Sequence, residues 1–285
     1  MITAGALRPT AKRAAKTALS TAKAPAHPLL RRWLLGRGVD ITETAAAQSC
    51  LVVAPHPDDE TIGPGALIAR KRAAGAAVRV AVVTDGRFSH RSSVLSPAEL
   101  GAVREAESRA ACAELGVAPS EVRFLGFMEN ALGADLFAVA AALRQEILDT
   151  APEQILVVSD LDWHPDHKAV HQALLCAARD CAFDGEILAF PVWFWAEGPW
   201  RSRPGANLAA AARDFVVHPV QARRIPPPRL VSTAGFAEQK RRAFECYASQ
   251  TTNLTGEPGW AQFDPAWIEP FLAPAEIFLP VRTGW

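Results

Sequence analysis

Short apolar runs alternate with segments of helical periodicity over most of the chain, and this alternation limits the possible folds more than any other feature. Short apolar runs bounded by polar residues suit buried strands. They lie at Cys50–Ala54, Val78–Val83, Val122–Leu125, Ile155–Val158 and Ile187–Phe190. Between two of them, apolar residues recur at helical spacing from Leu136 to Ile147. Strands that alternate with helices predict an α/β fold, a mostly parallel sheet with helices on both faces.

Local signals also predict where helices begin and end. Ser96-Pro97-Ala98-Glu99 has the pattern of a capping box with proline at the first helical position. Gly116 is expected to end that helix. In an open parallel sheet the ligand lies outside the carboxyl ends of the strands. The two most polar segments of the chain both follow predicted strands directly, so we expect the functional site there.

Length and composition favour an ordinary globular protein. The 285 residues suit one large domain, or one domain with an appendage. No apolar run approaches the ~18 residues needed to cross a bilayer, so we expect no membrane span. The five cysteines form no C-x-x-C pair, which favours reduced, buried thiols in a cytoplasmic protein.

Charge is distributed unevenly along the chain. Residues 1–39 contain eight basic residues and no acidic one, which leaves 22 basic against 30 acidic residues in the remainder. A net-acidic body argues against a core that binds nucleic acid. We therefore divide the chain into a basic N-terminal extension, residues 1–46, and one domain, residues 47–285.

Three interpretations of the extension remain open. The basic amphipathic stretch Leu29–Leu35 fits a peripheral membrane contact, with leucines in the interface and arginines on phosphates. A solvated extension that caps the domain fits as well, and we favour it. An arginine-rich, acid-free N-terminus also resembles an organelle transit peptide. The sequence does not indicate an oligomeric state.

The first cluster of ionisable residues is His56-Pro57-Asp58-Asp59-Glu60, directly after the first predicted strand. One imidazole and three carboxylates within five residues are costly to hold together unless a positive charge lies among them. A divalent metal would supply that charge, since histidine nitrogen and carboxylate oxygen are both good zinc ligands.

The second cluster is Asp162-Trp163-His164-Pro165-Asp166-His167, which follows the predicted strand Ile155–Val158. Two histidines three residues apart flank an aspartate, and a carboxylate commonly fixes the tautomer of a ligating imidazole. A single acidic cluster would be read as a solvated turn or a helix cap. Two such clusters at the carboxyl ends of strands together predict a metal site.

These motifs resemble those of the PIG-L/LmbE-like deacetylases. The first, HPDDE, is followed by a glycine-containing turn, a helix and Val-Val-Thr-Asp-Gly at residues 82–86; the second is D-x-H-P-D-H at residues 162–167. The resemblance covers about residues 48–252. It implies a Rossmann-like, three-layer α/β/α fold with the active site at the carboxyl ends of the strands.

The resemblance implies a set of metal ligands. His56, Asp59 and His167 would bind zinc and leave one position open for water, as a catalytic zinc site requires. Zinc, iron, cobalt and manganese can share such ligands, so another divalent metal is an alternative.

The resemblance also implies roles in catalysis and substrate binding. Asp58 would be the general base, and a protonated His164, oriented by Asp166, would stabilise the oxyanion. The reaction would remove the acetyl group of an N-acetylglucosamine-type sugar or glycoconjugate, giving a free amine and acetate. Arg104 and Glu129 would bind this substrate, although the family often has an aspartate at the position of Glu129.

Other functions fit the same residues. An amidase acting on a sugar–thiol conjugate or another acyl-amino sugar would use the same ligands. A catalytically silent protein with a metal-binding site would keep them without hydrolysis, but the intact pair of Asp58 and His164 argues against it. A metallophosphoesterase fits less well, because two-metal enzymes of that kind need more carboxylate ligands.

Further histidines and tryptophans have more than one interpretation. His171 is interpreted as a helix-surface residue rather than a fourth ligand, and His90 is a weak candidate for reaching the site. An aromatic cluster fits either a sugar-binding wall or the packing of a lid. It comprises Trp193, Phe194, Trp195 and Trp200. Trp260 and Trp267 are expected to pack in the core.

Overall fold

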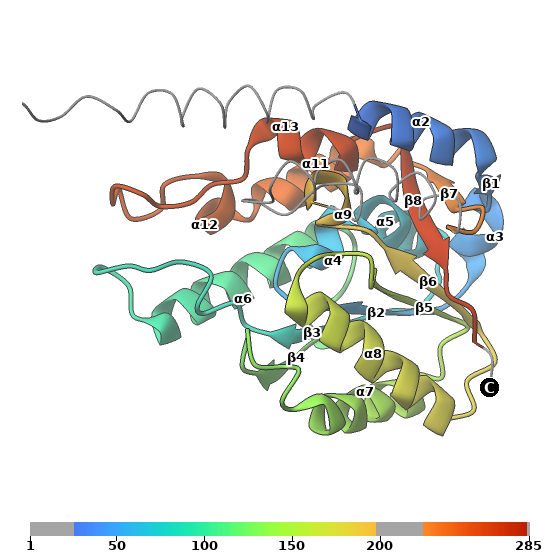
Figure 1. Ribbon diagram of the computed structural model, residues 1–285, viewed down its shortest axis with the longest axis horizontal. Coiled ribbons are helices and arrows are strands. Elements are labelled where there is room, and N and C mark those ends of the chain that lie inside the picture. Colours follow the sequence, from blue (N-terminus) through green and yellow to red (C-terminus); the bar gives the residue numbers. More distant parts are fainter. Residues whose placement is uncertain (1–25, 198–224, 284–285) are drawn as a thin grey trace, which may run out of the picture.

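The computed structural model describes residues 26–197 and 225–283, which form a three-layer α/β/α structure. Its central sheet has eight strands in the order β1-β7-β8-β6-β5-β2-β3-β4. Helices α7 and α8 pack together on one face, and α5, α6 and α11 pack together on the other (Figure 1). The predicted fold class is therefore confirmed.

The five predicted strands are all present as β2 to β6, and three further strands complete the sheet. The strands are β1 (Val39–Asp40), β2 (Cys50–Ala54), β3 (Val78–Thr84), β4 (Val122–Phe127), β5 (Gln154–Val158), β6 (Glu186–Phe190), β7 (Arg229–Ser232) and β8 (Ala275–Pro280). The sequence did not reveal β1, β7 or β8, because they are short or lie among irregular segments. β8 also runs antiparallel to both of its neighbours.

The helices follow the predicted alternation with the strands. They are α2 (Ala26–Arg37), α3 (Thr42–Ala47), α4 (Asp59–Ile62), α5 (Gly65–Ala73), α6 (Pro97–Glu114), α7 (Leu136–Thr150), α8 (Pro165–Asp180), α9 (Phe194–Glu197), α11 (Ala237–Glu245), α12 (Ala248–Thr251) and α13 (Pro265–Ile268), with 3₁₀ turns at Pro119–Glu121 and Glu269–Phe271. The predicted capping box of α6 is confirmed, since the side chains of Ser96 and Glu99 each accept the other's backbone N–H. Gly116, with φ 83°, follows the end of this helix as expected.

The strand order reverses between β2 and β5, the two strands that the ionisable clusters follow. β2 pairs in parallel with β3 on one side and with β5 on the other, and all residues of β2 and β5 are buried. The chain continues from β2 towards β3 and β4, and from β5 towards β6 on the opposite side. Such a switch point opens a crevice at the carboxyl ends of the strands. The fold therefore brings two clusters about 100 residues apart in sequence to one place.

The C-terminal third is fastened to the sheet by a buried ion pair. Glu276 on β8 accepts a hydrogen bond from Lys240 Nζ at 2.7 Å, and both side chains are almost fully buried. The same carboxylate accepts the backbone N–H groups of Ala66 and Leu67 in the first turn of α5. These partners satisfy amides that a helix N-terminus leaves without intrahelical bonds.

Part of the predicted N-terminal extension packs on the domain. In α2, Leu34 is fully buried and Arg31 donates to the carbonyl oxygen of Ala275 at 2.9 Å. β1 adds to the sheet edge beside β7. Residues 1–25 lie outside the described residues, and the boundary at residue 46 stays a prediction. Among the helices of residues 26–197 and 225–283, none has the length and apolar character needed to cross a membrane.

Candidate metal centre and cavity

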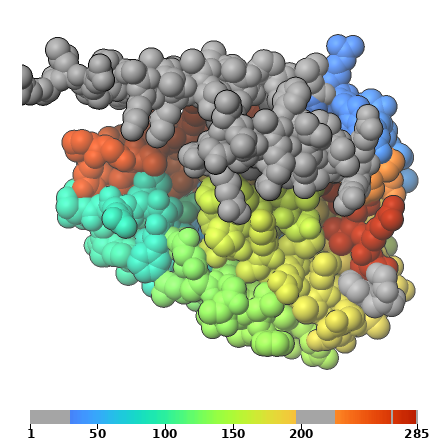
Figure 2. Space-filling view, viewed as in Figure 1, coloured from blue at the N-terminus to red at the C-terminus, as the bar shows by residue number. Residues whose placement is uncertain are grey.

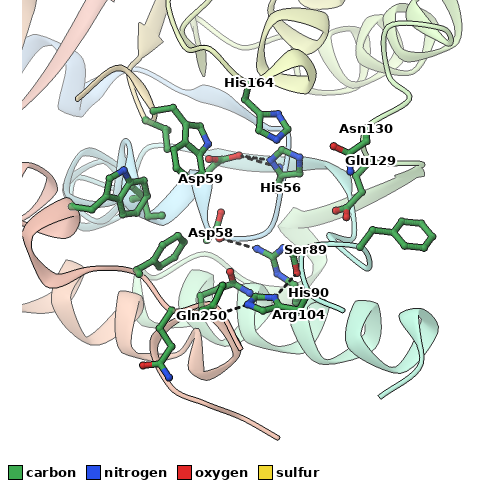
Figure 3. A pocket seen from close by; sticks show the side chains of 18 residues that line it. His56, Asp58, Asp59, Ser89, His90, Arg104, Glu129, Asn130, His164 and Gln250 are labelled. Carbon is green, nitrogen blue, oxygen red and sulfur yellow. Dashed lines mark hydrogen bonds and ion pairs between the residues drawn. The ribbon is translucent and has the colours of Figure 1, made fainter. Parts of the chain in front are cut away.

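The two ionisable clusters meet at the switch point between β2 and β5. His56, Asp59 and His167 each offer one ligand atom, and these atoms lie within 4.8 Å of one another. Asp59 Oδ2 lies 3.3 Å from His56 Nδ1 and 3.4 Å from His167 Nε2. Figure 3 shows Asp59 and His56 facing each other, with His164 beside them. The structure thus brings together the three side chains predicted to bind a metal.

The surroundings of His167 fit a metal ligand. Its Nδ1 donates to Asp162 Oδ2 at 2.8 Å, which turns Nε2 towards Asp59. That Nε2 is buried and has no hydrogen-bond partner among the described residues. Burial lowers the pKa of His167, but the carboxylates of Asp59 and Asp162 raise it to about 10. An excess of buried negative charge facing an unpartnered ring nitrogen is the environment that a divalent cation balances.

Asp162 supports His167 from behind, and sequence reasoning did not assign it a role. It is fully buried. Besides the imidazole, it accepts the backbone N–H of Phe194 at 2.7 Å and that of Val192 at 3.2 Å. A sequence signal was present, because Asp162 begins the second motif.

The carboxylate of Asp166 does not orient His164, contrary to the expectation from the resemblance. Its Oδ2 accepts hydrogen bonds from His56 Nε2 at 3.2 Å and from the backbone N–H of Asn130 at 2.7 Å. Asp166 contacts His164 through its backbone N–H, which donates to His164 Nδ1 at 3.2 Å. The cause is that His164 is the N-cap of α8, so its ring accepts a free amide of the first helical turn.

This geometry also changes the expected protonation of His164. Burial and the neighbouring imidazoles of His56 and His167 lower the pKa of His164 to about 4. Because Nδ1 accepts a hydrogen bond, the neutral ring carries its proton on Nε2. The predicted protonated form is therefore disfavoured, but the neutral ring still has one N–H to donate.

Asp58 lies beside the candidate ligands in a conformation that L-residues rarely adopt. Its φ is 127°, and its side chain is buried. Backbone strain of this kind costs roughly 1–3 kcal/mol and persists where surrounding contacts enforce it. Burial raises the pKa of Asp58 to about 8, and the negative charges of Asp59 and Glu60 add to this rise, whereas Arg104 opposes it.

A buried carboxylate behind the loop holds this conformation. Glu60 has no exposed surface, and one of its oxygens accepts the backbone N–H of Asp58 at 3.0 Å. The other oxygen accepts the hydroxyl groups of Ser108 at 2.6 Å and Tyr247 at 2.5 Å. The network joins the first motif to α6 and to Tyr247, which lies between α11 and α12.

Arg104 holds the same loop from the cavity side. Its Nη2 donates to Asp58 Oδ2 at 2.8 Å and to the carbonyl oxygen of Pro57 at 2.6 Å. Gly86 leaves room for it, since a Cβ there would lie 2.2 Å from Arg104 Nη1. Arg104 lines the cavity, so its predicted contact with substrate stays a prediction, but its main partner in the structure is Asp58.

Two of the candidate ligands, His56 and Asp59, line a cavity of about 360 Å³, and His167 lies buried behind them. Glu129 and Asn130 lie to one side of His56, as Figure 3 shows. Glu129 is buried and its Oε1 has no hydrogen-bond partner among the described residues. Burial raises the pKa of Glu129. Phe263, Trp267 and Trp193 also line this cavity.

Hydrogen bonds join two loops beside the cavity. Glu257 accepts hydrogen bonds from the hydroxyl groups of Ser92 and Ser93. His90 Nε2 contacts the carbonyl oxygen of Ala261 at 2.9 Å. Figure 2 shows the segments around residues 90–110 and 245–265 against each other at one end of the molecule. His90 lines the cavity, so this histidine does reach the site.

Other expectations have mixed outcomes. His171 is not on the surface: it is buried, and its Nδ1 contacts the carbonyl oxygen of Val158 at 2.8 Å. Trp260 is buried, with Nε1 donating to the carbonyl oxygen of Ser249, and Trp267 packs against the core as expected and also lines the cavity. In the aromatic cluster, Phe194 and Trp195 are core residues, Trp193 lines the cavity and Trp200 lies outside the described residues.

The fold and the site define an α/β protein with a candidate metal centre at the carboxyl edge of its sheet. The family model described as "PIG-L: GlcNAc-PI de-N-acetylase" matches residues 51–178. A 1D-myo-inositol 2-acetamido-2-deoxy-alpha-D-glucopyranoside deacetylase of Acidothermus cellulolyticus is 30% identical over 239 residues, which are 71% of this chain and 80% of the relative. The chain belongs to the PIG-L family, as its motifs predict.

The match to other relatives is shorter. The chain spans 58% and 53% of two further relatives with the same description, from Salinispora arenicola and Actinosynnema mirum. The activities of these two relatives are therefore not assigned to this chain.

Solved structures share the fold at low identity. The zinc-inhibited form of teicoplanin deacetylase Orf2 has a TM-score of 0.59 at 21% identity, over 83% of this chain and 99% of its own. GalB, a 4-carboxy-2-hydroxymuconate hydratase from Pseudomonas putida KT2440, has a TM-score of 0.56 at 18% identity, over 84% and 98%. Because a hydratase and a deacetylase both adopt it, the fold alone does not specify the reaction.

Proposed function

We propose that this protein is a zinc-dependent hydrolase that removes the acetyl group of an N-acetylglucosamine-type sugar or glycoconjugate. One observation carries the proposal: three ligand atoms, from His56, Asp59 and His167, converge at the wall of a cavity that His56, Asp59 and the buried carboxylate of Asp58 line. Family membership supports it, since the PIG-L family model and the first relative are both described as deacetylases of amino sugars.

The donor set suits zinc. Two imidazole nitrogens and one carboxylate oxygen, with a further position open, are a common catalytic zinc arrangement. Zinc bound there would polarise the amide carbonyl and lower the pKa of a neighbouring water. Iron, cobalt and manganese accept the same donors, and metal analysis of the purified protein distinguishes them.

The residues around the metal position would carry the proton transfers. Asp58 accepts a proton from the attacking water as the new C–O bond forms. His164 donates from Nε2 to the oxygen on which negative charge develops. The C–N bond then breaks, and the proton held by Asp58 passes to the nitrogen. The products are a free amino sugar and acetate.

Other residues would position these groups. Arg104 and Glu60 hold Asp58 from its two sides, through its carboxylate and its backbone N–H. Glu129 is the best placed to bind the sugar, because an unpartnered buried carboxylate oxygen accepts hydroxyl hydrogen bonds. Cytoplasmic location and a peripheral membrane contact stay predictions.

Release of acetate by zinc-loaded protein tests the proposal. Substrates are N-acetylglucosamine and its nucleotide-linked, lipid-linked and inositol-linked forms, together with short chitooligosaccharides. The test variant is Asp58→Asn, and the matched control is Asp160→Asn, an exposed aspartate on the second loop. We expect release by the wild type and the control but not by Asp58→Asn.

Three results would contradict the proposal. Equal release by Asp58→Asn with normal zinc content would remove the assigned base. Release of longer acyl groups or hydrolysis of sugar–thiol conjugates, without release of acetate, would establish the rival amidase. No hydrolysis of any substrate by protein that binds one zinc per chain would favour a silent binding protein.

A further inference from the structure

Four aromatic side chains form a continuous row, of which three line the cavity and the fourth lies beside it. The rings of Phe263 and Trp267 are stacked at 4.6 Å, Trp267 and Trp193 lie 5.1 Å apart, and Trp193 meets Trp163 edge to face at 5.7 Å. We call these four residues the aromatic row. They come from three separate segments, so the tertiary fold assembles the row.

The row leads from the protein core to the surface. At its inner end Phe263 stacks on Phe244, a core residue, at 5.9 Å. At its outer end Trp163 is 44% exposed, although the three other members are half-buried. Trp163 does not line the cavity itself, so it is placed to contact whatever extends out of the cavity.

The outer end of the row lies next to the reacting groups. The ring of Trp163 is 5.4 Å from that of His164, which in turn is 4.9 Å from that of His56. A sugar whose acetamido group reaches the metal ligands therefore has the row beside it. A group that is attached to that sugar and extends towards the row lies within reach of Trp163.

The chemistry of the row selects an uncharged apolar group. Aromatic faces bind apolar groups and the C–H faces of rings. No cation–π contact in residues 26–197 and 225–283 involves a ring of the row; the arginines concerned lie over Trp195, Trp33, Phe236 and Phe124. The cavity wall holds three carboxylates, of which Arg104 pairs with that of Asp58, and the remaining two, Asp59 and Glu129, disfavour an anion.

We propose that the aromatic row is a subsite for an apolar, uncharged aglycone attached to the N-acetylated sugar. Trp163 is the specificity-determining residue at its outer end. This inference rests on the proposed deacetylase function, because it assigns the part of the substrate that is not hydrolysed.

The test compares glycosides that differ only in the aglycone. Zinc-loaded full-length protein is given the methyl, cyclohexyl and phenyl glycosides of N-acetylglucosamine, each as both anomers, and kcat/KM is measured from acetate release. We expect the phenyl and cyclohexyl glycosides to be preferred over the methyl glycoside. Because an aromatic pair contributes about 0.5–1.5 kcal/mol, Trp163→Ala should lower this preference about 3- to 10-fold.

Two further variants make the result specific. Trp163→Phe keeps an aromatic face and should retain most of the preference. Leu148→Ala is the matched control, because Leu148 is an exposed apolar residue, 49% exposed, near the C-terminal end of α7. It should leave the preference unchanged. The ratio between glycosides cancels any general effect of Trp163→Ala on His164, which all substrates share.

Each other outcome overturns the proposal. Equal kcat/KM for all three glycosides would reject the subsite and leave the deacetylase function standing. An unchanged preference in Trp163→Ala would place the aglycone on another wall of the cavity. Its loss instead in Phe88→Ala, a change at a cavity-lining residue outside the row, would do the same. Absence of release from every glycoside would contradict the proposed function and this inference with it.

Discussion

The loops after β2 and β5 are built alike but stabilised differently. Each places a histidine at the cavity, His56 or His164, and each has a fully buried carboxylate behind it, Glu60 in the first loop and Asp162 in the second. Glu60 accepts the backbone N–H of Asp58, whereas Asp162 accepts a hydrogen from the ring of His167. One carboxylate thus fixes a backbone and the other fixes an imidazole.

Because of this difference, we expect the supporting carboxylates of the two loops to serve different roles. The first loop contributes two candidate ligands, His56 and Asp59, and also the candidate base, whose position depends on a φ of 127°. The second contributes a candidate ligand, whose free nitrogen depends on the tautomer. Loss of the support for Asp58 in the first loop should therefore impair turnover. Loss of the support for His167 in the second loop should impair metal binding.

The largest effect is expected from removing the base of the first loop. Asp58→Asn keeps the size of the side chain but cannot accept the proton, so kcat should fall by about 10²–10⁴-fold. Zinc content, measured by atomic absorption, should stay at the wild-type value. A parallel loss of zinc would mean that Asp58 is a ligand and would end the distinction between the two roles.

A smaller effect, on metal affinity, is expected behind the second loop. Asp162→Asn leaves His167 in place but weakens the bond that orients its ring, so the zinc dissociation constant should rise about 10- to 100-fold. Competition with a fluorescent chelator measures it. Saturating zinc should restore most of the activity. If metal affinity is unchanged and turnover alone is lost, the comparison between the loops is wrong.

The pH dependence of metal binding tests the same ligand. In the metal-free protein Asp59 and Asp162 raise the pKa of His167 to about 10, so the ring is protonated at neutral pH. Metal binding must displace that proton, and affinity should therefore rise with pH, by about tenfold per unit for one proton below that pKa. Calorimetry in buffers of different ionisation enthalpy counts the protons released. A pH-independent affinity would show that no ligand gives up a proton.

The smallest effect is expected from removing the hydrogen bond that Tyr247 donates to Glu60. Tyr247→Phe removes the hydroxyl and keeps the buried ring, which should lower the free energy of unfolding by about 1–2 kcal/mol. Since Glu60 retains Ser108 and the backbone N–H of Asp58, kcat should fall only a few-fold, with zinc affinity and KM unchanged. Urea unfolding and steady-state kinetics measure these quantities. An equal rise in KM would indicate a general disturbance of the cavity.

The local patterns of the sequence were sufficient for much of the fold and for the identity of the site. Buried strands, capping signals and the spacing of the two motifs depend on residues close together in the chain. They predicted five strands, the boundaries of α6 and a metal site at the two clusters, and the family resemblance then implied the three candidate ligands. The three missed strands depend on pairing between distant segments, and β1 has only two residues.

Contacts between residues far apart in the chain could not be predicted from these local patterns. The buried ion pair of Arg104 with Asp58, 46 residues away in the chain, was not predicted, and the contact of Arg104 with substrate stays a prediction. The carboxylate of Asp166 bonds to His56, 110 residues away, rather than to its neighbour His164. Both differences arise because a side chain pairs with whatever group the packed loops place opposite it.

The sequence by itself determined which chemical groups are present and which strand each cluster follows, because apolar periodicity and motif spacing are local properties. Only the tertiary structure decided how those groups are held: the strained backbone of Asp58, the neutral ring of His164 and the aromatic row that ends at Trp163. The physical reason is that burial, tautomer and ring stacking are set by the surrounding atoms, and residues far apart in the chain supply most of those atoms.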